Sequence, residues 1–166
     1  MNKLKHLVRN ICQLIINIFF VGHHFWGIKR CLLRVAGATI GKNVRVVGPI
    51  YYTASLIIGS DTFIGRKFEV HGNGKLTIGD KCDIAPEVSI LTGSHEIAGH
   101  QQRAGKGKSF SISIGDGCWI GGRVTIMGDT TVGNGAIIGA CSLVNKTIAD
   151  DVLAAGVPVR VIRKLE

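Results

Sequence analysis

Residues 114–144, IGDGCWIGGRVTIMGDTTVGNGAIIGACSLV, repeat a pattern of six residues. Each hexad opens with Ile or Val, and most continue with glycine. An amphipathic helix repeats about every 3.6 residues and a half-buried strand about every 2, so neither element alone explains this spacing. The pattern predicts short strands joined by turns and stacked in coils, which together bury the branched side chains that one repeat could not bury alone.

The same period runs through most of the chain. Stepping by six from Ile40 reaches Val46, Tyr52, Ile58, Ile64 and Val70, then, after a two-residue slip near Gly72, Ile78, Ile84 and Ile90. The fifth residue of a hexad is small or apolar, and the third and fourth are often turn formers such as Asn134-Gly135, whose residue types tolerate an unusual backbone. We expect one domain, with an N-terminal segment over residues 1–35 and the repeat over residues 36–165.

One segment leaves the repeat without disturbing its phase. Ile90 and Ile114 lie four hexads apart, so about 18 residues, expected at 96–113, form an excursion and not a domain boundary. Its basic residues are Arg103, Lys106 and Lys108, and the glycines between them predict flexibility. A long loop on a regular scaffold is typical of a functional site.

Two motifs carry a resemblance to a known family. The hexads of residues 114–143 resemble the hexapeptide-repeat acyltransferases, and LTGSHE at residues 91–96 is similar to the Thr-x-x-His motif of the galactoside, maltose and nodulation-factor O-acetyltransferases. The resemblance implies an all-β fold, a left-handed parallel β-helix with three hexads per coil, and a catalytic role for His95. A sugar hydroxyl attacks a thioester poorly until a base takes its proton, and imidazole side chains suit that role near neutral pH.

The resemblance also implies the remaining site residues. Trp119 and Gly122 would lie beside the acceptor, with an amide at or next to Gly122 donating to the thioester oxyanion. The coenzyme A groove would be lined by Ala140, Asn145, Lys146, Arg160 and Arg163, and lysine and arginine suit the phosphates of coenzyme A. Family members commonly have Thr-Lys where this chain has Asn145-Lys146. The family's upstream acceptor residues do not align across the slip, which leaves Asn73, Asp83, Glu69 and His71 as candidates.

Two other chemistries stay open on the sequence alone. His95 and His100, together with His71, could hold zinc as in the γ-class carbonic anhydrases, because three imidazoles with an open position activate water. His100 lies in the excursion, however, whereas that family places its ligands on regular coils. A cysteine nucleophile, Cys118 or Cys141, is a weaker alternative, because the five cysteines are scattered without a CxxC pair, as is typical of reduced, packed thiols.

Residues 1–30 differ from the repeat. Their apolar run, residues 11–21, is about 11 residues long and is flanked by basic residues, whereas a membrane-spanning helix needs about 20. The segment is expected either to pack against its own protein or a trimer partner, or to lie in a membrane interface facing anionic lipid. Because the hexads begin later, we expect the β-helix to fold without residues 1–30.

The formal net charge of +9 indicates anionic partners, but scarce aromatic residues and the absence of a basic helical stripe argue against nucleic acid.

We predict an acetyl-CoA-dependent O-acetyltransferase that modifies a saccharide in bacterial lipopolysaccharide, capsule or exopolysaccharide synthesis. A streptogramin-type xenobiotic acetyltransferase is the alternative within the family. We expect a homotrimer with sites between subunits and no metal. We expect it to be cytoplasmic, with residues 1–30 peripheral to the inner membrane if they bind lipid.

Overall fold

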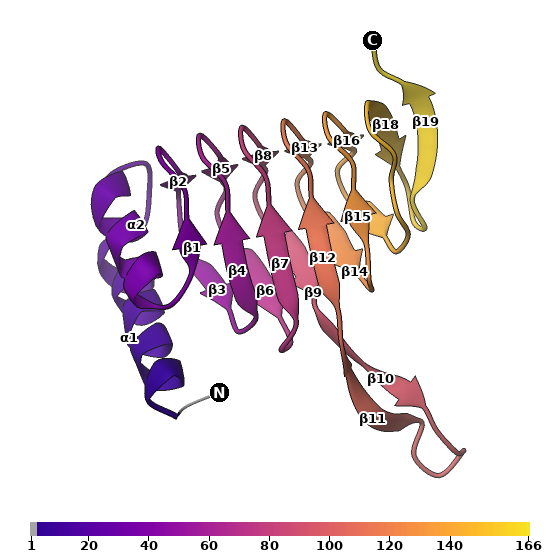
Figure 1. Cartoon of the computed structure of the whole chain (residues 1–166), viewed down its shortest axis with the longest axis horizontal. Helices are drawn as coiled ribbons and strands as arrows, with labels where there is room; N and C mark the ends of the chain where they lie inside the picture. Colours follow the sequence, from indigo (N-terminus) through magenta and orange to yellow (C-terminus); the bar gives the residue numbers. More distant parts are fainter. Residues whose placement is uncertain (1–2) are drawn as a thin grey trace.

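The computed structural model describes residues 3–166, which form a parallel β-helix covered at one end by two helices (Figure 1). Three sheets make its three faces. The first face contains β1 (Thr39–Ile40), β4 (Ser55–Ile58), β7 (Lys75–Ile78), β12 (Ser111–Ile114) and β15 (Thr131–Val132). The second contains β2 (Arg45–Val46), β5 (Phe63–Ile64), β8 (Asp83–Ile84), β13 (Trp119–Ile120), β16 (Ile137–Ile138), β18 (Val152–Ala155) and β19 (Arg160–Lys164). The third contains β3 (Ile50–Tyr52), β6 (Phe68–His71), β9 (Ser89–Leu91), β14 (Thr125–Met127) and β17 (Leu143–Val144).

The register of the strands confirms the six-residue period. On the first face Ile58 pairs with Ile40 on one side and with Ile78 on the other, so the branched residues that open the hexads stack directly above one another. The other two faces repeat this arrangement. These side chains are buried in a single hydrophobic core that runs the length of the β-helix. Each coil thus covers the apolar side chains of the next, which is why a chain with short strands can be stable.

Two positions of a hexad meet different requirements at the turns. On the first face, and on most of the second, the fourth residue of a hexad adopts the left-handed backbone even when it is not glycine, with φ of 58° at Asp61, 56° at Lys81 and 59° at Arg123. The glycine at the second position serves close stacking. A Cβ at Gly115 would lie 2.5 Å from the side-chain oxygen of Asn134 in the next coil. Glycine is therefore required there by the approach of neighbouring coils, and not by its own dihedral angles.

The excursion is an ordered antiparallel hairpin made of β10 (Gly93–Ile97) and β11 (Ala104–Ser109), and it projects away from the β-helix (Figure 1). Its expected position at 96–113 is wrong, because residues 111–113 already belong to β12 on the first face. The phase of the hexads determines the length of an insertion but not where it starts. The chain leaves the coil directly after Thr92, whose carbonyl accepts a hydrogen bond from the Phe110 amide at 2.8 Å.

The N-terminal segment folds as α1 (Lys3–Phe19) and α2 (Trp26–Val35), which pack on the first coil. The side-chain amide of Gln13 exchanges two hydrogen bonds with the backbone of Tyr52, at 3.0 and 2.9 Å. Asn17 does the same with Ile50, at 2.9 and 2.8 Å. These two side chains therefore replace the neighbouring strand that β3 lacks. Neither helix of residues 3–166 is long and apolar enough to cross a membrane.

The second and first faces receive similar caps from α2. The Lys29 ammonium donates to the carbonyl oxygens of Gly22, Val46 and Val47, at 2.5, 2.7 and 3.3 Å. The Arg34 guanidinium donates to the carbonyl oxygen of Ile40 at 2.7 and 3.1 Å. An unpaired backbone group is costly when buried, so these bonds tie the helices to the β-helix. The bonds of Lys29 join residues 1–30 to the first coil, and the expectation that the β-helix folds without these residues stays a prediction.

Candidate active site

His95 lies on β10, where the hairpin leaves the corner between the third and first faces. It pairs in register with Gly107 of β11, and its side chain is exposed. Pairing with β11 restricts the backbone of His95, and the register of the two strands shifts between His95 and Ile97. The structure therefore presents an accessible imidazole at a well-defined position beside the β-helix.

Thr92 fixes the root of this hairpin. Its side chain is fully buried, and its hydroxyl donates to the carbonyl oxygen of His71 at 2.8 Å while accepting from the Gly74 amide at 3.2 Å. The threonine of the Thr-x-x-His motif thus bonds the hairpin root to the preceding coil. The motif pairs this anchoring threonine with an exposed histidine three positions later.

Asn73 lies at the same corner, in the coil before the hairpin. The slip inserts two residues here, because Phe68 pairs with Ile50, 18 residues earlier, whereas Ser89 pairs with Glu69, 20 residues earlier. The enlarged turn carries Asn73 to the base of the hairpin, where its side-chain oxygen accepts a hydrogen bond from the Ser109 hydroxyl at 2.7 Å. Among the upstream candidates, Asn73 is therefore placed beside the strand that carries His95.

Glu69 and His71 lie on β6 of the third face. Their side chains contact each other, with 3.0 Å between His71 Nε2 and Glu69 Oε2, and the His71 ring lies 5.4 Å from that of Tyr51. These contacts give both side chains a local structural role. Asp83, by contrast, lies on β8 of the second face, where it pairs with Trp119 in the next coil.

Trp119 and the predicted oxyanion residue belong to the second face and its corner with the third. Trp119 is 56% exposed, which is unusual for so large an apolar side chain in a single chain. Gly122 lies in the following turn, and its carbonyl accepts from the Cys141 amide at 2.9 Å, so Ala140 lies in the stacked turn of the next coil. A Cβ at Gly122 would come no closer than 3.4 Å to the nearest backbone atom, the Pro86 carbonyl oxygen.

The predicted coenzyme residues divide between two places. Arg160 and Arg163 lie on β19, which extends the second face by pairing with Ala155 and Leu153 of β18. Asn145 and Lys146 lie in the turn between β17 and the bridge at Ile148, at the corner of the third and first faces. All four side chains are exposed.

One chain therefore carries two separate groups of candidate residues. The corner of the third and first faces holds Asn73, His95, Asn145 and Lys146. The second face and its corner with the third hold Asp83, Trp119, Gly122, Ala140, Arg160 and Arg163. In a triangular prism a corner lies opposite the remaining face, so the body of the β-helix separates His95 from Trp119. The single chain does not bring the predicted site together.

The two alternative chemistries find little geometric support. Within residues 3–166 no three His, Cys, Asp or Glu side chains form a group that could hold a metal ion, and His100 lies at the turn of the hairpin. Cys118 is buried, with 3.0 Å between its sulfur and the carbonyl oxygen of Gly133. Hydrogen bonding with Cys82 and burial raise the pKa of the Cys118 thiol. A thiol that resists ionisation is a poor nucleophile.

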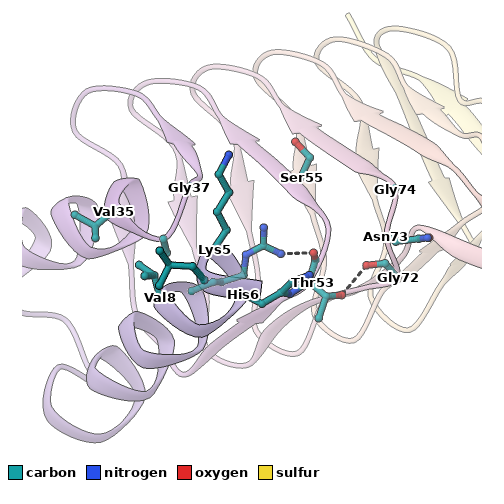
Figure 2. Close-up of a pocket in the computed structure, with 13 residues that line it drawn as sticks. Lys5, His6, Val8, Val35, Gly37, Thr53, Ser55, Gly72, Asn73 and Gly74 are labelled. Atoms are coloured by element: carbon teal, nitrogen blue, oxygen red, sulfur yellow. Dashed lines mark hydrogen bonds between the residues drawn. The ribbon is translucent and has the colours of Figure 1, made fainter. Parts of the chain in front are cut away.

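A cleft of about 860 Å³ opens beside the hairpin corner, between α1, the end of α2 and the first coils (Figure 2). We call it the α1 cleft. Lys5 and His6 of α1 line one side, and Thr53, Ser55 and Asn73 line the other. Sequence reasoning did not find it, because Lys5 and Thr53 are brought together only by the packing of α1 on the first coil. Asn73 connects the cleft to the hairpin root, since its side chain bonds to Ser109.

The fold and these groups define a hexapeptide-repeat acyltransferase, and the chain belongs to this family. The family model described as bacterial transferase hexapeptide, six repeats, matches residues 111–146. The chain is 38% identical over 143 residues to the galactoside O-acetyltransferase of Escherichia coli (strain K12), covering 82% of this chain and 68% of that protein. It is 35% identical over 136 residues to the acetyltransferase WcaF of the same strain, named for colanic acid biosynthesis, covering 80% and 72% of the two chains.

A solved structure gives the same result in three dimensions. The hexapeptide-repeat acetyltransferase of Vibrio cholerae, complexed with acetyl coenzyme A, superposes with a TM-score of 0.87 at 28% identity, covering 99% of this chain and 88% of that one. The predicted family and the left-handed β-helix are therefore confirmed, and the protein is an acetyltransferase. The similarity to named acetyltransferases favours acyl transfer over the metal lyase.

Proposed function

We propose that this acetyltransferase moves the acetyl group of acetyl-coenzyme A to a hydroxyl of a saccharide, with His95 as the general base. His95 would accept the hydroxyl proton while the oxygen attacks the thioester carbonyl. The backbone amide at or next to Gly122 would stabilise the oxyanion, and the departing coenzyme A thiolate would take the proton back from the imidazolium. The products are an acetyl ester and free coenzyme A, and no acyl-enzyme is required.

The observation that carries this proposal is the accessible His95 on the paired strand β10, at a corner opposite Trp119. A second copy of the chain, with its second face against this corner, would supply Trp119, Gly122, Arg160 and Arg163 to the His95 of its neighbour. We therefore propose a homotrimer with three such sites, in which the coenzyme lies between two chains. The exposure of Trp119 supports this arrangement, because a large apolar side chain gains stability when a partner covers it.

We place the acceptor in the α1 cleft, because it adjoins the hairpin root through Asn73. Hydroxyl and amide groups from Thr53, Ser55 and Asn73 suit the hydroxyls of a sugar, while Lys5 and His6 favour an acceptor with a negative charge. A saccharide carrying a phosphate or diphosphate has both features. The similarity to the acetyltransferase named for colanic acid biosynthesis supports a polysaccharide precursor as the acceptor class.

Coenzyme A release by the purified full chain would test this proposal against three acceptor panels: nucleotide sugars, neutral oligosaccharides and streptogramin antibiotics. We expect turnover with the phosphorylated saccharides, and Lys5→Gln should reduce it more for them than for neutral ones. Turnover with the antibiotics alone would overturn the saccharide proposal and favour a xenobiotic acetyltransferase.

A further inference from the structure

The outer surface of α1 carries an apolar stripe. Leu7, Ile11, Leu14 and Ile18 recur at intervals of three and four residues and are 47–59% exposed. They lie opposite the face that packs on the first coil, which contains Cys12, Gln13 and Ile16. The stripe therefore runs along a helix of 17 residues, about 25 Å long, on the side turned away from the protein.

The second helix extends this surface. Ile28 and Val35 of α2 are 43% and 60% exposed. Phe19, the last residue of α1, is 70% exposed, and Phe25, in the connection between the helices, is 57% exposed. Both helices cover the N-terminal end of the β-helix (Figure 1). The exposed apolar side chains of α1, α2 and their connection, which we call the apolar end face, thus gather on one end of the molecule.

The charge of the chain is concentrated at this same end. Eight of the 20 lysines and arginines precede Asp61, whereas none of the 11 acidic residues does. Residues 61–166 then hold 12 basic against 11 acidic residues, so nearly all of the net charge of +9 belongs to residues 1–60. The exposed members of the basic set are Lys3, Lys5, Arg34, Lys42 and Arg45.

We propose that the apolar end face docks on an anionic phospholipid surface. An interfacial helix inserts its apolar side about 5–10 Å into the headgroup boundary, while nearby basic residues bind the negative headgroups. A second copy fits this end less well, because two such ends facing each other would bring together cationic surfaces with no acidic residue to pair with. This inference does not rest on the proposed function, since lipid binding needs neither acetyl-CoA nor an acceptor.

Co-sedimentation of the full chain with vesicles tests this docking. We expect binding to phosphatidylcholine vesicles that contain phosphatidylglycerol to be at least about ten-fold tighter than to phosphatidylcholine alone, and to weaken at high salt. The double variant Ile11→Gln/Ile18→Gln should lose about ten-fold in affinity for the mixed vesicles. The matched control Ile97→Gln/Ile162→Gln, which replaces exposed isoleucines far from α1, should bind like the wild type.

A second variant keeps the test independent of folding. Lys3 is exposed and takes no part in capping the first coil, so Lys3→Gln should fold normally and bind the mixed vesicles about five-fold less tightly, whereas Lys81→Gln should not. Equal binding by stripe and control variants, or no preference for the anionic lipid, would overturn the proposal. A stripe variant that changes only the oligomeric state, without vesicle binding by the wild type, would assign the end face to a second copy.

Discussion

His95 and His100 share one hairpin, and only His95 stands at its root. His95→Ala should lower kcat by roughly 10²- to 10⁴-fold, the range typical of losing a general base, with little change in acetyl-CoA affinity. Steady-state kinetics and coenzyme binding by calorimetry would measure the two effects. His100→Ala is the matched control and should retain activity within about two-fold. Equal losses in both variants would contradict a role specific to His95.

Arg160 and Arg163 are expected to act on binding and not on the chemical step. Replacing both with glutamine would remove the charge-assisted hydrogen bonds proposed for the coenzyme phosphates, so the KM for acetyl-CoA should rise by about ten-fold or more while kcat at saturation stays close to that of the wild type. Lys81→Gln, in a turn between the first and second faces, is the control. A fall in kcat with unchanged KM would show that these arginines serve the chemistry instead.

At the scale of elements, α1 substitutes for a missing strand. Gln13→Leu keeps the size of the side chain but leaves both backbone groups of Tyr52 without their partner. Each buried unpaired group costs about 1–3 kcal/mol, so the free energy of unfolding should fall by about 3 kcal/mol in denaturant titrations. Asn10→Leu, on the exposed side of the same helix, should change it by less than about 0.5 kcal/mol. An unchanged stability in Gln13→Leu would mean that the cap is dispensable.

Lys29 gives the second helix a pH dependence. Desolvation lowers the pKa of Lys29 from 10.5 to about 8 in the folded protein. Between these values the folded chain has released a proton that the unfolded chain still holds, so the contribution of Lys29 to unfolding free energy rises as pH increases. From pH 8 to 10 the free energy of unfolding of the wild type should therefore rise, relative to that of Lys29→Met, by up to about 2 kcal/mol. A constant difference would mean that the three carbonyl acceptors keep the ammonium charged.

Elements that depend on local repeats could be predicted, and those that depend on distant contacts could not. The inward position of Ile58 follows from its place in a hexad, and so does the assignment of each hexad to one face. Counting hexads therefore already places His95 and Trp119 on different sides of the β-helix. The residue at which the hairpin starts could not be predicted, because the unchanged phase of the hexads fixes only the length of the insertion. The bonds of Gln13 and Asn17 join residues 39 and 33 positions apart and leave no local pattern.

At the scale of the whole molecule, the two ends of the β-helix differ. Helices close the N-terminal end, and at the other end β19 turns back antiparallel on β18 (Figure 1). Copies stacked end to end would need free strand edges at both ends of the β-helix. The hydrogen bonds from α1 and α2 already occupy the strand edges of the first coil. Growth along the axis is therefore disfavoured, and association through the lateral faces is left as the route to a closed assembly.

A site shared between lateral neighbours predicts that two inactive variants can restore each other. His95→Ala lacks the base, and Trp119→Ala/Arg163→Gln lacks the opposite half of the site. When both are unfolded together, mixed in equal amounts and refolded, random assembly gives each interface a one in four chance of joining two intact halves. The mixture should recover about one quarter of the wild-type rate at low acetyl-CoA, whereas each variant refolded alone should stay at least about ten-fold below the wild type. Separately refolded variants mixed afterwards are the control for slow exchange. No recovery, with mass measurements confirming mixed trimers, would mean that each chain holds a complete site.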